Sequence, residues 1–284
     1  MKYKQDRKQA DSLAHNYPVT SLTPRELRLF PPDAMLRLSV AANWNQTTSD
    51  WQRMLALSPG LCWGIEVDGK LAATATAIVY DSKLAWIGMV LTLPEFRGRG
   101  LARRLIAHLL ELLQIQGIKQ IKLDATSMGA SLYREFGFVE EAPIERWSRS
   151  GMAVDAIGNG TWDAALDTIA TGASRLQLLN ALARDSVVWA LEDGSFAMLR
   201  PGSNASYLGP IVARNERGAK QLLASLPEAA VAFWDLFPDH LEAKALATQL
   251  GFRPVRQLLR MSLGNSDLNP NIHLHFGIAG FEYG

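Results

Sequence analysis

The sequence has little cysteine and almost no imbalance of charge. Cys62 is the one cysteine among 284 residues, which excludes an intramolecular disulfide framework and a cysteine-based zinc site, and fits a reducing cytoplasm. The 29 Lys and Arg residues against 28 Asp and Glu residues leave a net charge of +1. Because nucleic-acid-binding domains usually carry a clustered basic surplus, we do not expect a general polyanion-binding protein.

Long hydrophobic runs are also missing. The longest, such as residues 84–91, are far shorter than the about 20 residues of a membrane-spanning helix, and residues 1–16 lack the apolar core of a secretion signal. We therefore expect a soluble, cytoplasmic protein, a monomer or a homodimer, with a flexible tail over residues 1–20. Hydrophobic residues make up 48 % of the chain, as in ordinary globular proteins, and the length suggests two domains.

Apolar periodicity and turn residues predict strands and helices in alternation. Pro31-Pro32 separates a short strand from a first helix, and a second helix ends before Pro59-Gly60. An amphipathic helix begins near Leu101 and ends before Gly117. Strands are expected over residues 27–30, 62–67, 71–80, 84–91 and 121–126 and, at the end, over 138–141 with 144–150; helices are expected over 34–42, 49–57, 101–116 and 128–136. This order is typical of a mixed α/β domain, complete by about residue 150.

Two faint echoes suggest that the domain is duplicated. SLYREFGF, with Gly137, is echoed by ALATQLGF, with Gly251, and MVLTLPEFRGRGLARRLIAHLL is echoed by GPIVARNERGAKQLLASL. A segment rich in glycine and small residues, 151–162, lies between them. Two echoes in the same order predict domains over residues 21–150 and 151–284.

The segment Arg97-Gly98-Arg99-Gly100-Leu101-Ala102 lies between the apolar strand and the amphipathic helix. Its glycines allow positive φ and close approach of a ligand to backbone N–H groups, and a helix N-terminus favours an anion such as a diphosphate. The arginines at 97, 99, 103 and 104 add positive charge. Alternatively, the segment is a tight turn with surface arginines. The patterns GxxxxGK[ST] and GxGxxG are both absent, which weakens a nucleotide site of either kind.

VLTLPEFRGRGLA, followed some thirty residues later by LYREFGF, resembles the GNAT superfamily of acetyl-CoA-dependent N-acetyltransferases. Its motif [QR]-x-x-G-x-[GA] is matched by Arg97, Gly100 and Ala102. The resemblance covers residues 22–150, and residues 160–284, with YLGPIVA and IAGFEYG, look like a divergent second domain of the same kind. It implies an α/β fold of two domains, each a twisted, mixed, mostly antiparallel sheet flanked by helices.

The resemblance also implies roles for single residues. Tyr133 would protonate the departing thiolate, and the backbone of Val90, Leu91 and Thr92 would pair with the pantetheine arm. Thr126 stands where many members have a cofactor-positioning Asn. The amides that would hold the diphosphate belong to Arg97, Gly98, Arg99, Gly100, Leu101 and Ala102. In the second domain Ala247 replaces the tyrosine and the motif is lost, so we expect no cofactor site there.

The general base and the acceptor pocket stay open at this point. Residues 86–91 contain no carboxylate, although many members carry one there, and Glu66, Asp124, Glu145 or a water are the candidates. Acceptor contacts are expected from Trp44, Asn45 and Glu145, with Gln46 beside them. Packing for Trp44 and helix capping for Asn45 are the alternatives. The second domain is expected to act as a lid on this pocket, reaching it through Asp235 or His240.

Three other residues invite chemical interpretations, and packing or a surface position accounts for each of them. Cys62 begins a predicted strand without a histidine partner, which favours a buried small residue over a nucleophile. His273 and His275 lie two apart but have no further ligand near them in sequence, so we expect no metal.

From the family resemblance we expect an N-acetyltransferase that uses acetyl-CoA and a small-molecule amine acceptor, without nucleic acid or membrane as partners. The alternative is a non-catalytic CoA-binding regulatory module.

Overall fold

The first half of the chain folds as a mixed sheet with helices on both faces. In this computed structural model the described residues are 22–151, 158, 160, 162–227, 231–265 and 267–284, so the expected tail and most of the expected linker lie outside them. The elements of this half are β1 (Arg25–Glu26), η2 (Leu27–Leu29), α2 (Pro32–Ala41), α3 (Thr48–Leu57), β2 (Cys62–Val67), β3 (Lys70–Tyr80), β4 (Leu84–Thr92), η3 (Pro94–Phe96), α4 (Leu101–Ile115), β5 (Gln120–Ala125), α5 (Ser127–Glu135) and β6 (Val139–Arg149).

The predicted strand over residues 27–30 is wrong. Only Arg25 and Glu26 pair with β2, and the Phe30 N–H then bonds back to the Leu27 carbonyl, so the chain turns in a 3-10 helix before Pro31. The other predicted elements of this half are confirmed. Along α4 the buried face includes Leu105, Leu109 and Leu113, and Gly117 follows the helix at φ 72°.

The second half repeats the pattern. Its elements are α6 (Ala164–Thr171), α7 (Leu176–Ala183), β7 (Val187–Ala190), β8 (Phe196–Arg200), β9 (Ser206–Val212), α8 (Glu216–Leu223), β10 (Ala232–Leu236), α9 (Leu241–Gln249), β11 (Arg253–Gly264), η4 (Ile272–Leu274) and β12 (His275–Gly277). Both sequence echoes coincide with equivalent elements: β4 and α4 match β9 and α8, and α5 matches α9. Gly137 and Gly251 follow those last two helices at φ 87° and 81°.

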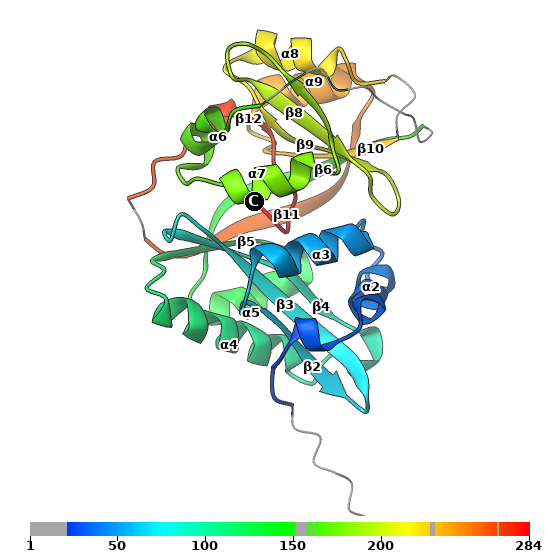
Figure 1. Cartoon of the computed structure of the whole chain (residues 1–284), viewed down its shortest axis with the longest axis vertical. Helices are drawn as coiled ribbons and strands as arrows, with labels where there is room; N and C mark the ends of the chain where they lie inside the picture. Colours follow the sequence, from blue (N-terminus) through cyan, green and yellow to red (C-terminus); the bar gives the residue numbers. More distant parts are fainter. Residues whose placement is uncertain (1–21, 152–157, 159, 161, 228–230, 266) are drawn as a thin grey trace, which may run out of the picture.

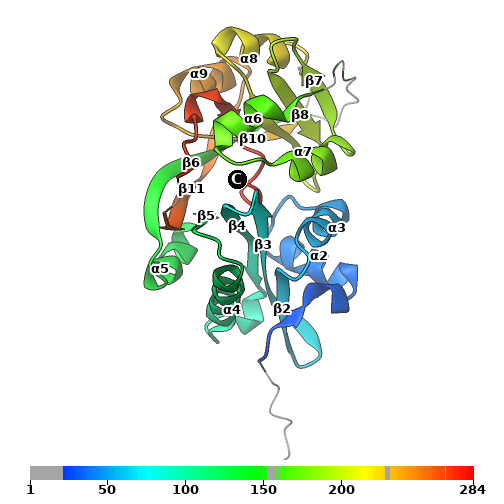
Figure 2. The same cartoon turned by 60° about the vertical axis from the view of Figure 1, so that its left-hand side comes forward.

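One continuous, mixed, mostly antiparallel sheet joins the halves. Its strand order is β1-β2-β3-β4-β5-β11-β6-β10-β9-β8-β7, with β12 beside β9. Strand β11, from the second half, lies between β5 and β6, while β6, from the first half, lies between β11 and β10. Figures 1 and 2 show these two long strands running between the halves. Each half thus completes its sheet with a strand of the other, so a cut at residue 150 would remove a strand from the first half.

Strand β4 diverges from β5 after a short pairing. The two are parallel neighbours from Leu84 to Trp86 only, and β4 then continues to Thr92 without β5 as a partner. On its other side β4 carries an irregularity opposite β3, where Met89 adopts φ 51°. The hydroxyls of Thr74 and Thr76 donate to the carbonyls of Met89 and Gly88, at 2.8 and 3.0 Å, and hold this bulge. A wedge-shaped opening between β4 and β5 results.

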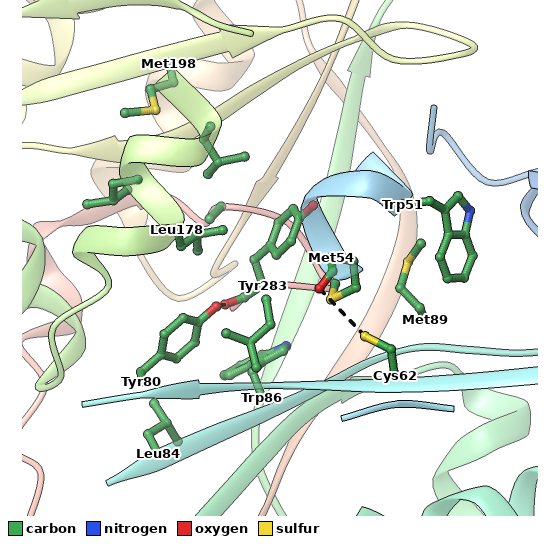
Figure 3. Close-up of a cluster of buried hydrophobic side chains, with 14 of the residues drawn as sticks. Trp51, Met54, Cys62, Tyr80, Leu84, Trp86, Met89, Leu178, Met198 and Tyr283 are labelled. Atoms are coloured by element: carbon green, nitrogen blue, oxygen red, sulfur yellow. Dashed lines mark hydrogen bonds between the residues drawn. The ribbon is translucent and has the colours of Figure 1, made fainter. Parts of the chain in front are cut away.

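The hydrophobic core also crosses between the halves. Figure 3 shows Trp51 and Met54 of α3 and Tyr80 and Trp86 of the sheet in one cluster with Leu178, Met198 and Tyr283 of the second half. The Tyr80 hydroxyl donates to the Tyr283 carbonyl over 2.8 Å, which ties the segment 280–284 to the first half. In both views of the whole chain, the last residues lie between the two halves.

Candidate functional site

A cavity of about 710 Å³ occupies the opening between β4 and β5. Its walls come from the α2–α3 connection, strand β4, the loop that leads into α4, helix α5 and strand β11, and the segment 280–284 forms part of its lining. This volume is within the range of small-molecule sites. The cavity therefore collects residues from both halves of the chain.

The glycine-rich loop forms one end of this cavity. Gly98 and Gly100 adopt φ 75° and 74°, as the sequence predicts, and a side chain at either would be strained. Gly100 is the N-cap of α4, and neither a capping side chain nor an acidic residue occupies the first turn. The first N–H groups of α4 have no intrahelical acceptor, so this end offers donors and a positive dipole to an anion.

The arginines of this loop differ in placement. Arg97 and Arg103 line the cavity, and Arg103 also forms an ion pair with Glu135. Arg99 stacks on the Phe96 ring at 5.2 Å and does not line the cavity. Arg104 is exposed on α4. Of the six predicted loop residues, Arg99 is thus placed to contribute only its backbone N–H, whereas the other five line the cavity.

The unpaired edge of β4 forms the long wall. Val90, Leu91 and Thr92, for which the family resemblance implies a binding edge, all line the cavity. Because β5 pairs with β4 only as far as Trp86, this edge faces the cavity instead of a neighbouring strand. An extended, amide-containing ligand is suited to such an edge.

Tyr133 and Thr126 lie on the opposite wall. Thr126 is the N-cap of α5, where its hydroxyl accepts from the Gly129 N–H over 3.2 Å and keeps its own proton free to donate. Tyr133 is 7 % exposed, packs edge-on against Phe138, and makes no side-chain hydrogen bond to another described residue. Burial raises the pKa of the Tyr133 phenol, so the hydroxyl keeps its proton throughout the neutral range.

The α2–α3 connection supplies the other end of the cavity. Trp44 and Gln46 line it, and the buried Gln46 Oε1 has no hydrogen-bond donor among the described residues. Asn45 does not line the cavity. Its side chain accepts hydrogen bonds from the Asn204 and Ala205 N–H groups and donates one to the Ala205 carbonyl. Asn45 therefore connects the segment before α3 to the second half of the chain.

The acidic candidates are scattered. Glu66 forms a 2.6 Å ion pair with Arg25, and Glu145 accepts from the Trp147 indole; neither lines the cavity. Asp124 lines it, but both its oxygens accept from Arg260 at 2.9 and 3.0 Å. Burial raises the pKa of Asp124, and Arg260 opposes this shift.

The second half reaches the cavity through residues other than the expected pair. Asp235 binds the Arg146 guanidinium with both oxygens at 2.7 Å, and His240 accepts the Ala243 N–H at the start of α9; neither lines the cavity. The residues that do are Arg256, Leu258, Phe281 and Glu282. The sequence offered no local signal for these four, because long-range packing alone brings them to β4.

The remaining reactive residues lie outside the cavity. Cys62 is buried, its thiol faces the Met54 carbonyl at 3.7 Å (Figure 3), and burial raises its pKa to about 12. His273 is exposed in η4 and His275 is buried at the start of β12. The described residues contain no group of three or more His, Cys, Asp or Glu side chains arranged to hold a metal ion. Nor does any helix among them have the length and hydrophobicity to span a membrane.

Comparison with known families gives two matches along the chain. Residues 29–138 match the acetyltransferase (GNAT) family, and residues 164–277 match an acetyltransferase (GNAT) domain. No curated protein sequence matches the chain significantly.

Solved structures resemble the whole chain. A protein from Pyrococcus horikoshii, provisionally classed as an acetyltransferase, superposes with a TM-score of 0.80 at 22 % identity, over 92 % of this chain and 95 % of its own. A tandem GNAT protein of the clavulanic acid biosynthesis pathway superposes with a TM-score of 0.60 at 16 % identity, over 86 % of this chain and 99 % of its own. A GCN5-related N-acetyltransferase from Sphaerobacter thermophilus superposes with a TM-score of 0.57 at 16 % identity, over 85 % of this chain and 95 % of its own. At these identities the similarity establishes the two-part fold.

Proposed function

This chain is a tandem member of the acetyltransferase (GNAT) family, and we propose that it moves the acetyl group of acetyl-CoA to a primary amine by direct attack, at one active site in its first half. The family establishes acetyl transfer from acetyl-CoA in general. The amine acceptor, its small size and the single site are our proposals. The observation that carries them is one cavity in which an anion-binding loop, an open strand edge and a buried phenol converge.

The residues present fit the co-substrate. Loop amides of residues 97–102, at the N-terminus of α4, would hold the diphosphate, with Arg97 adding charge. The free edge of Val90, Leu91 and Thr92 would bind the amides of the pantetheine arm. Acetyl-CoA supplies the activated acetyl group as a thioester. The protein's contribution is to align that group with the amine and to exclude water.

Tyr133 would act as the general acid. Its hydroxyl lies in the cavity wall with no other described side chain or backbone group to bind, and burial raises its pKa. The phenol is therefore protonated at neutral pH and can donate a hydrogen bond, and then its proton, to a departing thiolate. Thr126 would help to orient the arm through its free O–H.

The volume and lining of the cavity favour a small acceptor. Trp44, Gln46 and Phe281 line the same cavity as the open edge of β4, and its volume is about 710 Å³. Aromatic side chains with a few polar groups, in a cavity of this size, are typical of small-molecule sites.

Thermal unfolding and thiol release test this proposal. Acetyl-CoA should raise the melting temperature, whereas ATP, which lacks the pantetheine arm, should raise it far less. A panel of primary amines should then show acetyl-CoA-dependent release of free thiol. An unchanged melting temperature, or binding without thiol release across the panel, would contradict the proposed function.

A further inference from the structure

The proposed reaction needs a group that removes a proton from the acceptor. An alkylammonium has a pKa near that of lysine, about 10.4, so at neutral pH almost none of it carries the free electron pair that attacks a carbonyl. A base close to the amine is therefore required. The inference below names that base and depends on the proposed function.

Two of the described residues that line the cavity are acidic, and one of them is already engaged. The Asp124 side chain is fully buried, and both its carboxylate oxygens accept hydrogen bonds from the Arg260 guanidinium. Taking a proton would break this pairing and leave a buried cation alone, which is costly. Asp124 is thus suited to holding β11 against β5 rather than to proton transfer.

Glu282 is the other acidic residue, and it comes from the second half. Its backbone packs against Gly88 of β4 so closely that a Cβ at Gly88 would lie 2.8 Å from the Glu282 carbonyl oxygen. Gly88 belongs to the stretch of β4 that contains no carboxylate of its own. The segment 280–284 therefore brings the backbone of an acidic residue against the central strand from 194 positions further along the chain.

The Glu282 carboxylate is buried but loosely held. Its nearest ion-pair partner is the Arg200 guanidinium at 3.6 Å, and that guanidinium donates to the carbonyls of Gly209 and Ala279. By contrast, the backbone around it is firmly fixed, because the Trp86 indole donates to the Phe281 carbonyl over 2.9 Å. Glu282 accepts no side-chain hydrogen bond from another described residue, and Arg200 keeps its two carbonyl acceptors when Glu282 is protonated, so proton transfer at Glu282 does not leave that buried cation without partners.

Gln46 provides a second, independent indication. Its Oε1 is buried and unpartnered among the described residues, and the residue lines the same cavity as Glu282. A buried acceptor without a donor costs free energy unless a ligand supplies one. An amine N–H is such a donor.

We propose that Glu282 is the general base for the acceptor amine and that Gln46 Oε1 accepts a hydrogen bond from the same nitrogen. Glu282 takes one proton from the ammonium and passes it to solvent. The C–N bond then forms as the C–S bond breaks, and Tyr133 gives a proton to the departing sulfur. The second proton that leaves the nitrogen restores Tyr133.

The surroundings of Glu282 suit this role. Burial raises the pKa of its carboxyl, with Asp50 adding to the shift, while Arg200 and Arg146 oppose it. A carboxyl with a raised pKa is a stronger base once it has ionised. Transfer should therefore increase with pH as Glu282 loses its proton.

The Glu282→Gln variant tests the proposal with two probes of similar size. Methylamine is protonated at pH 7, whereas hydroxylamine is mostly neutral there and needs no base. The variant should transfer acetyl to methylamine roughly 100-fold more slowly than the wild type, in line with general-base effects of about 10²–10⁴. It should change transfer to hydroxylamine little, and the methylamine defect should shrink as pH rises.

Binding and spectroscopy separate this inference from the proposed function. Calorimetry should give equal acetyl-CoA affinity for Glu282→Gln and for a control, Glu242→Gln, which alters an acid that is 56 % exposed. Infrared difference titration against the variant should show a carboxyl that ionises above the ordinary glutamate value, about 4.3.

Four outcomes decide between the possibilities. Equal loss with both amines would assign Glu282 a structural role and overturn the inference, as would unchanged transfer to methylamine or a carboxyl that ionises at its ordinary value. Failure of the wild type to bind acetyl-CoA would instead contradict the proposed function.

Discussion

The two halves use the same elements and differ at one helix end. In the first half Gly100 begins α4 and leaves the N-terminal N–H groups uncapped by side chains. In the second half Asn215 begins α8, its side chain accepts from the Gly218 N–H over 3.0 Å, and Glu216 adds a negative charge to the first turn. An anion is favoured at the first helix end and opposed at the second.

The strand openings differ as well. In each half the two parallel strands pair over three residues, Leu84 to Trp86 with β5 and Ser206 to Leu208 with β10, and then diverge. The first opening is a cavity. The second is filled by β12, which pairs with β9, and the following Ile278 N–H bonds to the Asp235 carbonyl of β10 over 2.9 Å. A segment of the chain thus occupies the place that corresponds to the cavity of the first half.

The C-terminal segment lies in both openings and has a different part in each. Segment 275–284 fills the second opening with its first residues and brings Glu282 to the first opening with its last ones. Ala247, in the position of Tyr133, is fully buried in the second core. We infer that the second half has lost its own chemistry and completes that of the first.

Gly100→Trp is expected to have the largest effect. A side chain at this cap would block the loop amides, and loss of two charge-assisted hydrogen bonds at about 1.5–3 kcal/mol each predicts at least roughly 100-fold weaker acetyl-CoA binding. Gly117→Trp is the matched control, because Gly117 has nearly the same φ, 72° against 74°, and equally open space. Calorimetry should give one site per chain for the control and the wild type. A second site that survives in Gly100→Trp would contradict the comparison.

Tyr133→Phe should lower turnover about 100-fold or more while acetyl-CoA affinity stays the same, because general acids contribute about 10²–10⁴ to rate. Steady-state kinetics and calorimetry check the two parts. The control is Tyr207→Phe in the second half, which removes a 3.0 Å hydrogen bond to Asp235. That variant should lower stability and leave kcat nearly intact. Unchanged kcat in Tyr133→Phe would remove this residue from the mechanism.

Asn45→Ala should weaken the contact between the halves. The substitution removes three hydrogen bonds to residues 204 and 205 and leaves buried backbone groups unpaired, so we expect unfolding free energy to fall by about 2–3 kcal/mol. Asn204→Ala removes one exposed bond to the Trp44 carbonyl and should cost about 0.5 kcal/mol or less. Urea denaturation measures both. Equal costs would show that Asn45 does not hold the halves together.

His275 should give the smallest effect. Burial and the nearby Arg175, Arg260 and His240 hold its pKa well below 6.5, so the unfolded chain binds the proton more readily. The neutral His275 side chain therefore contributes its full share to the free energy of unfolding above pH 6.5. As the pH falls from 6.5 to 5.5, the free energy of unfolding should decrease by about 1 kcal/mol on account of this residue. His275→Gln should remove that part of the pH dependence, whereas the exposed His273→Gln should keep it. Urea midpoints at the two pH values decide this, and identical slopes for wild type and His275→Gln would refute it.

Much of the first half could be predicted from sequence because its signals are local. The periodicity of α4 and the glycines before it fix a strand, a loop and a helix end within some thirty residues, and the structure places these elements as expected. Trp44 and Gln46 follow from a short connection beside the site. Asn45 differs, because its amide finds better partners in a loop 160 residues away than in the cavity.

The sequence alone determined the family, the duplication and the position of the glycine-rich loop before α4, since each depends on short segments of the chain. The tertiary structure decided which distant segments of the chain contact one another. It brings Glu282 to Gly88, leaves Gln46 Oε1 without a donor, fills the second opening with β12 and exchanges β6 with β11. The physical reason is that these contacts join segments far apart in sequence, and only packing of the complete chain specifies which segments meet.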